Sequence, residues 1–168
     1  VDLGDPAPAV DWQIQAMDLP LAFGTEVATI PNRVPYLHAD PADIPAWRRR
    51  VAELPGIKVG LVWAGLSREG SDWAVRLDRR RSMSLSMFAP LAAIPGVSFV
   101  SLQKGLPAEQ AASPPDGMRL HDWTDDLHDF ADTAALIECL DLTISVDTSV
   151  AHLAGALGKP VWILNRFD

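Results

Sequence analysis

Short, continuously apolar runs alternate with helical patterns along most of the chain after residue 57. The five runs occupy residues 58–65, 97–103, 118–123, 142–147 and 160–165. Continuous apolar character, without a polar residue at every second position, is typical of strands buried on both faces of a parallel sheet. The pattern therefore predicts five parallel strands with helices between them.

Three helices are expected between these strands. The first spans residues 84–96 and stops at the Pro95-Gly96 pair. The second spans residues 126–140, with Asp125 or Asp126 as its N-cap. Its apolar positions recur every three or four residues, which predicts a buried stripe of Leu127, Phe130, Ala134 and Ile137.

The third helix is expected over residues 149–157, and it has no charged side chain. Thr148 or Ser149 is a good N-cap, and Gly158 followed by Pro160 is a strong C-terminal stop. The stripe expected to face the sheet comprises Val150, Leu153, Ala154 and Leu157. The opposite side comprises Ser149, His152, Gly155 and Ala156, whose mostly small side chains would let a ligand approach the backbone.

Strand–helix–strand repeats with right-handed crossovers build an open, doubly wound sheet. We therefore expect an α/β fold with a Rossmann-like parallel sheet in the order 3-2-1-4-5. Residues 57–168 would form this domain.

Residues 1–56 hold eight of the fourteen prolines, a density that opposes both long helices and central strands. We expect an interdomain linker here that packs on a domain. One short helix, capped by Asp43, is predicted around residues 43–54, with Trp47, Val51 and Leu54 on one side. The run of arginines at 48–50 is expected to be solvated.

Composition narrows the functional classes. The net charge is −8 and the isoelectric point is about 4.8, which argues against non-specific binding to nucleic acid or to anionic membranes. The lone Cys139 cannot form an internal disulfide, so we expect a structural thiol and a cytoplasmic location. No apolar run is long enough to span a membrane, and the start at Val1, without Met, suggests a fragment.

Ligands of such sheets bind beyond the carboxyl ends of the strands. Polar or small residues follow four of the expected strands: Trp63 and Gly65, Gln103 and Lys104, His121 and Asp122, and Asp147, Thr148 and Ser149. The helix after Thr148 would present free N–H groups and the positive end of its dipole, which suit a phosphate. The alternative is that Thr148 and Ser149 only cap a buried helix.

Other sites typical of α/β enzymes are absent from the sequence. There is no G-x-G-x-x-G after the first strand, no G-x-x-x-x-G-K-[ST] and no G-x-S-x-G. His38, His121, His128 and His152 do not stand at metal-ligand spacings, so no metal site is expected.

Several segments together carry a family resemblance. They read VGLVWAG, RSMSL, VSFVSLQKG and DFADTAALIECLDLTISVDTSVAHLAGALGKPVWIL, with IPNRVPYL upstream. They resemble the C-terminal half of bacterial glycosyltransferase-like proteins that follow tetratricopeptide repeats. These are similar to ADP-heptose–lipopolysaccharide heptosyltransferases and, more distantly, to O-linked N-acetylglucosamine transferases. The resemblance covers residues 18–168.

The resemblance implies half of a GT-B fold, in which two Rossmann-like domains face each other across a cleft. This half would bind a nucleotide-diphosphate sugar, with no metal and no cofactor. Thr148 and Ser149 would hold the diphosphate, Asp147 would orient the loop or touch the sugar, and His152 would face the cleft. Four further residues would lie near the nucleotide or its phosphates: Gln103, Lys104, Arg81 and Ser82. Sugar transfer would proceed by displacement at the anomeric carbon, with the leaving diphosphate stabilised electrostatically.

The family pattern also predicts partners: an N-terminal GT-B domain, tetratricopeptide repeats, and self-association of the fragment through its uncovered surface. The chain departs from the pattern at Ser149, where heptosyltransferases commonly have Gly, and over residues 66–80, where a longer loop lacks the usual His. The fifth strand would be followed by a closing helix, so the domain is expected to be incomplete at its C-terminus. Two other hypotheses stay open: a non-catalytic scaffold, and another nucleotide-sugar enzyme such as an epimerase.

Overall fold

The computed structural model describes residues 9–65, 76 and 80–165. Contacts within the chain divide it into two compact units, Val1–Arg33 and Val34–Asp168. The second unit contains the sheet together with residues 34–56, which were expected to belong to a linker.

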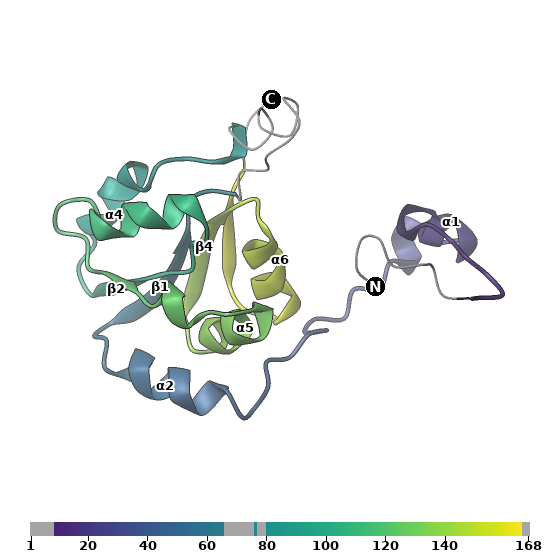
Figure 1. Cartoon of the computed structure of the whole chain (residues 1–168), viewed down its shortest axis with the longest axis horizontal. Coiled ribbons are helices and arrows are strands. Elements are labelled where there is room, and N and C mark those ends of the chain that lie inside the picture. Colours follow the sequence, from purple (N-terminus) through teal and green to yellow (C-terminus); the bar gives the residue numbers. More distant parts are fainter. Residues whose placement is uncertain (1–8, 66–75, 77–79, 166–168) are drawn as a thin grey trace. The chain divides into compact units, whose positions relative to one another are not determined.

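A five-stranded parallel sheet forms the centre of the second unit (Figure 1). Its strands are β1 (Ile57–Val62), β2 (Val97–Ser101), β3 (Leu120–Asp122), β4 (Leu142–Val146) and β5 (Val161–Leu164). The order β3-β2-β1-β4-β5 confirms the predicted topology and the α/β class. Right-handed crossovers leave the first strand in the middle of such a sheet.

The register brings the carboxyl ends of the central strands together. Leu61 lies opposite Ser101 on one side and Ile144 on the other, and Val62 lies opposite Ser145. Polar residues that follow these strands are therefore neighbours, although they are far apart in the sequence. The expectation of double-sided burial is wrong for β5, because this edge strand leaves Trp162 62% exposed.

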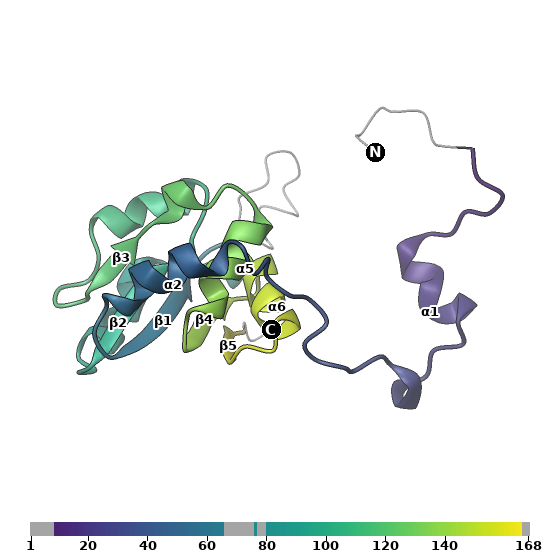
Figure 2. The same cartoon turned by 90° about the horizontal axis from the view of Figure 1, so that it is seen from below.

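Helices cover both faces of the sheet (Figures 1 and 2). On one face, α2 (Ile44–Ala52), α5 (Phe130–Glu138) and α6 (Ser149–Ala156) pack over Val62 and Val100. On the other face, a 3₁₀ turn, η3 (Leu85–Phe88), and the short α4 (Ala89–Ala92) pack over Leu61 and Phe99. The expected helix over residues 84–96 is thus a 3₁₀ turn followed by a single helical turn.

Two details of the predicted α5 are wrong. Its N-cap is Asp129, whose carboxylate accepts the N–H groups of Ala131 and Asp132, rather than Asp125 or Asp126. Its first residue, Phe130, is 59% exposed instead of buried with the rest of the predicted stripe. The helix begins three or four residues later than the predicted caps required, so Phe130 lies in its first turn instead of its interior.

The N-terminal part of the second unit packs through α2, as predicted from Asp43 onward. Trp47, Val51 and Leu54 are buried on the face of the sheet that α5 and α6 cover. Arg50 is not merely solvated, because its guanidinium stacks on two tryptophan rings and pairs with Asp126. Further upstream, the backbone N–H groups of residues 36 and 37 donate to the carbonyl of Ala156 in α6.

The α6 helix departs from its predicted faces at one position. Ala156, expected on the open side, is buried with Ala151, Ala154 and Leu157. The contact of its carbonyl with residues 36 and 37 explains this burial. Gly155 does lie on an open side, since a Cβ added there would meet nothing within 4 Å.

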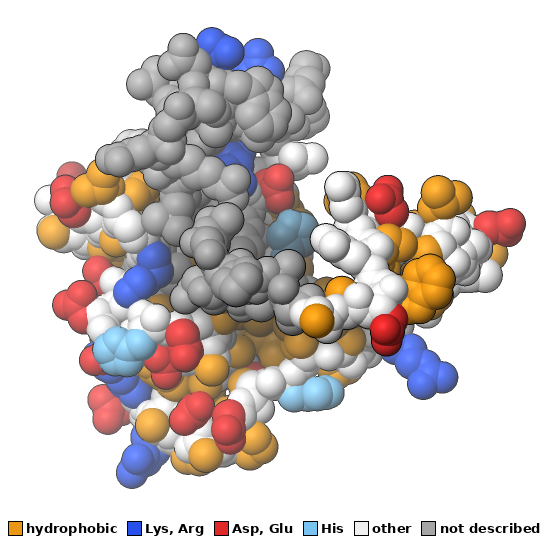
Figure 3. Space-filling model, turned by 45° about the vertical axis from the view of Figure 1, so that its right-hand side comes forward, with side chains coloured by type: hydrophobic (Ala, Val, Ile, Leu, Met, Phe, Trp, Pro, Cys, Tyr) orange, Lys and Arg blue, Asp and Glu red, His pale blue; other side chains and the backbone are white. Residues whose placement is uncertain are grey.

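The first unit is described over residues 9–33, where three short elements form: η1 (Ala16–Asp18), α1 (Leu19–Ala22) and η2 (Val27–Thr29). None of these elements contains a buried residue. Large apolar side chains are open to solvent here, including Trp12, Leu21 and Val27. Figure 3 shows hydrophobic side chains at the surface among the charged ones. Across the described residues, no helix combines the length and the apolar character needed to cross a membrane.

Candidate functional site

A pocket of about 330 Å³ opens at the carboxyl edge of the sheet, between the ends of β1 and β2 and the N-termini of α5 and α6. Six of the residues predicted from the sequence line it: Gly65, Arg81, Gln103, Lys104, Thr148 and Ser149. The remaining lining consists of Val62, Ala64, Leu102, Phe130, Thr133 and Val150. The topology therefore assembles one hollow, with both polar and apolar lining, from five separate segments.

Gln103 reaches the pocket but uses its amide to join two strand ends. Its Oε1 accepts the backbone N–H groups of Trp63, at 3.0 Å, and Ala64, at 2.8 Å. Its Nε2 donates to the carbonyls of Ala64, at 3.0 Å, and Lys104, at 2.9 Å. The side chain is buried with all of these bonds made, so Gln103 fixes the backbone on which Lys104 stands.

Two predicted residues lie in the framework of the pocket and do not line it. Trp63 is fully buried, and its indole N–H donates to the carbonyl of Pro107 at 3.1 Å. Ser82 accepts the N–H of Gly65 at 3.0 Å through its hydroxyl. Both residues hold the segment after β1 in place.

The N-terminus of α6 faces the pocket without a side-chain cap. Thr148 is the N-cap residue, in extended conformation, but its hydroxyl lies 2.9 Å from the Ser145 hydroxyl instead of bonding a helix N–H. The Ser145 hydroxyl donates to the Val146 carbonyl, so Thr148 is the donor in this pair. No acidic side chain stands in the first turn of α6. The N-cap side chain and the first turn therefore supply no carboxylate to the backbone N–H groups at this helix end.

Asp147 and His152 lie together outside the pocket lining. His152 Nε2 is 3.4 Å from Asp147 Oδ1, and both side chains are largely exposed. The Asp147 carbonyl accepts a hydrogen bond from the Arg81 guanidinium at 3.1 Å. This bond ties the segment before β2 to the end of β4 and keeps a positive charge at the mouth of α6.

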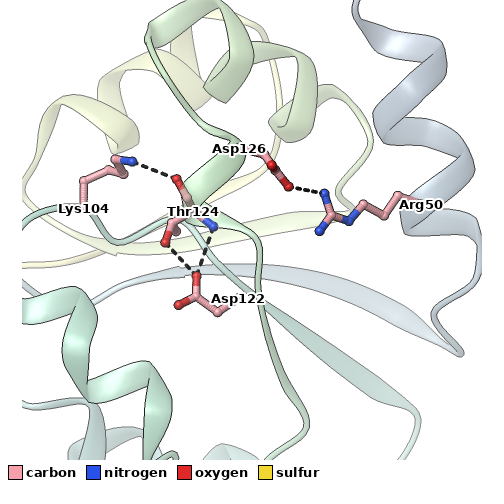
Figure 4. Close-up of polar contacts among 5 residues, drawn as sticks. All are labelled: Arg50, Lys104, Asp122, Thr124 and Asp126. Atoms are coloured by element: carbon pink, nitrogen blue, oxygen red, sulfur yellow. Dashed lines mark hydrogen bonds and ion pairs between the residues drawn. The ribbon is translucent and has the colours of Figure 1, made fainter.

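Lys104 brings a second positive charge to the pocket. Its Nζ donates to the carbonyl of Thr124 at 2.7 Å. Thr124 is itself buried and donates through both its N–H and its hydroxyl to Asp122 Oδ1, at 3.1 Å and 2.8 Å. Lys104 is thus held over a turn that follows β3 (Figure 4).

Phe130 and Thr133 of α5 were not among the site residues predicted from the sequence. Phe130 lines the pocket with an exposed ring, and Thr133 lines it while its hydroxyl donates to the Asp129 carbonyl at 2.8 Å. The helical periodicity placed Phe130 in the core. The Asp129 next to it, a strong N-cap residue, was the available signal that the helix begins at Phe130.

Among the residues that the structure describes, two groups outside the pocket have shifted pKa values. Burial, followed by the positive charge of Arg119, lowers the pKa of His121. Burial raises the pKa of the Cys139 thiol, which donates to the Ala135 carbonyl at 3.4 Å. In the parts of the chain that are described, no cluster of three or more His, Cys, Asp or Glu residues is placed to hold a metal ion.

Sequence comparison relates parts of the chain to known proteins. Residues 128–164 match the sequence model of Glycosyltransferase family 9 (heptosyltransferase), over α5, β4, α6 and β5. The chain is also 34% identical over 140 residues to Protein FlbA of Caulobacter vibrioides, which covers 80% of this chain. The chain spans only 22% of the length of that relative. No solved structure matches the chain. Residues 128–164, which include the open helix end, are therefore heptosyltransferase-like in sequence, and the second unit has a Rossmann-like fold.

Proposed function

We propose that this chain is the donor-binding part of a glycosyltransferase that uses a nucleoside-diphosphate sugar and needs no metal ion. The observation that carries the proposal is the uncapped N-terminus of α6, which opens into a pocket with Lys104 and Arg81. A helix N-terminus and two cations together suit a diphosphate, although the chain as a whole is acidic.

Each part of the donor has a counterpart in the pocket. The backbone N–H groups of Ser149 and Val150 would bind the diphosphate, with Lys104 and Arg81 as its counter-charges. The exposed ring of Phe130 offers a flat apolar surface for the nucleobase. The sugar would then lie toward Asp147 and His152, outside the pocket lining.

The reaction would break the bond between the anomeric carbon and the diphosphate oxygen as the acceptor oxygen attacks. Negative charge then builds up on the leaving diphosphate, and fixed N–H dipoles with two cations stabilise that charge without a metal ion. The acceptor and the group that removes its proton would come from a second domain. We propose a GT-B partner domain, preceded by tetratricopeptide repeats in the parent protein.

The test is calorimetric titration of the chain with ADP, UDP and GDP, each with and without EDTA. We expect one of them to bind, with an affinity that EDTA leaves unchanged. Lys104→Met removes a counter-charge and should weaken binding roughly tenfold, as expected for the loss of a hydrogen bond to a charged group. The matched control is Lys58→Met at the opposite end of β1, which should bind like the parent chain.

Transfer is tested separately, with a labelled donor panel and the full-length parent as reference. The isolated chain should show no turnover, because one wall of a cleft cannot hold donor and acceptor together. Failure of every nucleoside diphosphate to bind would contradict the proposed function. Turnover by the isolated chain would contradict the requirement for a second domain.

A further inference from the structure

The turn that follows β3 connects the pocket to α2. On its inner side, the carbonyl of Thr124 accepts the Lys104 ammonium, and Asp122 fixes Thr124 through two hydrogen bonds. On its outer side, Asp126 pairs with Arg50 of α2, with 2.5 Å between Oδ2 and the guanidinium nitrogen (Figure 4). The turn therefore binds the Lys104 ammonium on its inner side and the Arg50 guanidinium on its outer side.

Arg50 is itself held in place by two aromatic rings. Its guanidinium carbon lies 4.5 Å from the ring centroid of Trp123, which begins the turn, and 5.5 Å from that of Trp47, which belongs to α2. The two rings are 6.2 Å apart. Arg50, Trp47 and Trp123 together form what we call the clamp. Because Trp47 is buried, the clamp is anchored in the core.

The clamp matters for Lys104 because a lysine ammonium stands on a flexible four-carbon stem. Gln103 fixes the backbone carbonyl of Lys104, but this leaves the stem free to rotate. The Thr124 carbonyl accepts one of the three ammonium hydrogens and directs the group. A cation directed in advance loses less conformational freedom when an anion binds.

We propose that Arg50 is a positioning residue for the anion site: through Asp126 and Trp123 it holds the turn whose Thr124 carbonyl directs the Lys104 ammonium into the pocket. This inference rests on the proposed function for its ligand, a nucleoside diphosphate. Under this proposal α2 contributes to the anion site, although it precedes every strand of the sheet in the sequence. Arg50 touches no ligand and acts only through the turn.

A simpler role would be to dock α2 on the domain. Loss of the Arg50 side chain would then lower the free energy of unfolding but leave the position of the Lys104 ammonium unchanged. Amine labelling followed by mass spectrometry separates the two roles, because the chain has only three lysines: Lys58, Lys104 and Lys159. The other two lysines serve as internal references, and the labelling needs no ligand.

The experiment compares Arg50→Met and Asp126→Asn with Arg49→Met, an exposed arginine on the same helix. We expect the first two variants to raise the labelling rate of Lys104 relative to Lys58 by roughly three- to tenfold. This range corresponds to the coupling free energy between residues of one hydrogen-bonded network. Arg49→Met should leave it unchanged. Circular dichroism confirms that each variant is folded. Asp126→Asn retains Arg50 on its tryptophan rings, so it still tests the proposal if Arg50→Met does not fold.

The same variants are then titrated with the nucleoside diphosphate that the parent chain binds best. Arg50→Met should weaken binding by roughly the same factor, and should have no further effect when Lys104 is already Met. Unchanged Lys104 labelling in both Arg50→Met and Asp126→Asn, or a full additional loss in the Lys104→Met background, would overturn the positioning role. Absence of any binding by the parent chain would refute the proposed function instead, while the labelling result would still decide how Lys104 is held.

Discussion

The two helices that flank β4 both begin at the pocket, but their N-termini are chemically opposite. α5 begins with a carboxylate: Asp129 accepts the N–H groups of Ala131 and Asp132 at 2.7 Å and 3.0 Å. Asp132 in its first turn accepts the N–H of His128. At α6, the N-cap Thr148 instead directs its hydroxyl to Ser145.

This difference shows that the position of a helix in the fold does not by itself make an anion site. At α5 the positive end of the dipole is already neutralised, and two carboxylates would repel a phosphate. At α6 the same end is open and two cations stand near it. In the proposed site, α6 would therefore bind the charged part of the ligand and α5 would offer the uncharged surface of Phe130 and Thr133.

Making α6 resemble α5 should have the largest effect. Thr148→Asp places a capping carboxylate on the N–H groups meant for the ligand. We expect nucleoside-diphosphate affinity to fall roughly 100-fold, because two hydrogen bonds to a charged group are lost. The free energy of unfolding should rise by about 1 kcal/mol, because the helix gains a cap.

Calorimetry and urea denaturation measure the two effects of Thr148→Asp. Thr148→Val is the matched control, since it removes the hydroxyl without adding charge. Binding by Thr148→Asp as tight as that of the parent chain, in a folded protein, would show that the diphosphate does not bind at α6.

The uncharged surface of α5 can be tested with two ligands. Phe130→Ala should weaken binding of the nucleoside diphosphate roughly tenfold, as loss of a stacked base does, and leave the affinity for pyrophosphate unchanged. Phe130→Trp should preserve nucleotide binding. An equal loss for both ligands would show that Phe130 shapes the diphosphate site and does not contact a base.

Removing the cap of α5 should affect stability alone. Asp129→Ala leaves two helix N–H groups without their acceptor and should lower the free energy of unfolding by about 1 kcal/mol. Asp125→Ala, at the position that the sequence also allowed as a cap, should have a smaller effect. Urea denaturation of both variants measures the difference, and equal losses would contradict the assignment of Asp129 as the cap.

These two helix ends also show what the sequence could predict. The strand order followed from continuous apolar runs, which depend only on burial of each segment. The start of α6 after Thr148 followed from the Thr and Ser residues after β4, but the turn of the Thr148 hydroxyl toward Ser145, which leaves the helix end uncapped, did not. The cap of α5 did not, because several aspartates near it are equivalent in a one-dimensional pattern. What separates them is tertiary: Asp126 pairs with Arg50, which is 76 positions away.

Other misses have the same cause. Trp63 stands at a strand end, where a ligand contact was the natural expectation, but it is buried and its indole N–H donates to the Pro107 carbonyl. Gln103 does line the pocket, but its amide is bonded to the backbone of neighbouring segments. A sequence shows that a residue follows a strand, not which way its side chain turns. The loop over residues 66–75 and 77–79, where the family pattern departs, lies outside the described residues.

The smallest expected effect concerns the third strand end, which carries His121. Burial and Arg119 lower its folded-state pKa below the unfolded value of about 6.5. Between these two pKa values the unfolded chain binds more protons, so the free energy of unfolding should fall as the pH is lowered from 7 through this range, and level off below the folded pKa.

Denaturant titrations at a series of pH values measure the slope for the parent chain and for His121→Gln. The variant should have a shallower slope there, whereas nucleotide affinity at pH 7 should be equal in the two proteins, because His121 does not line the pocket. An unchanged slope in His121→Gln would assign the acid sensitivity to other groups and remove this strand end from the comparison.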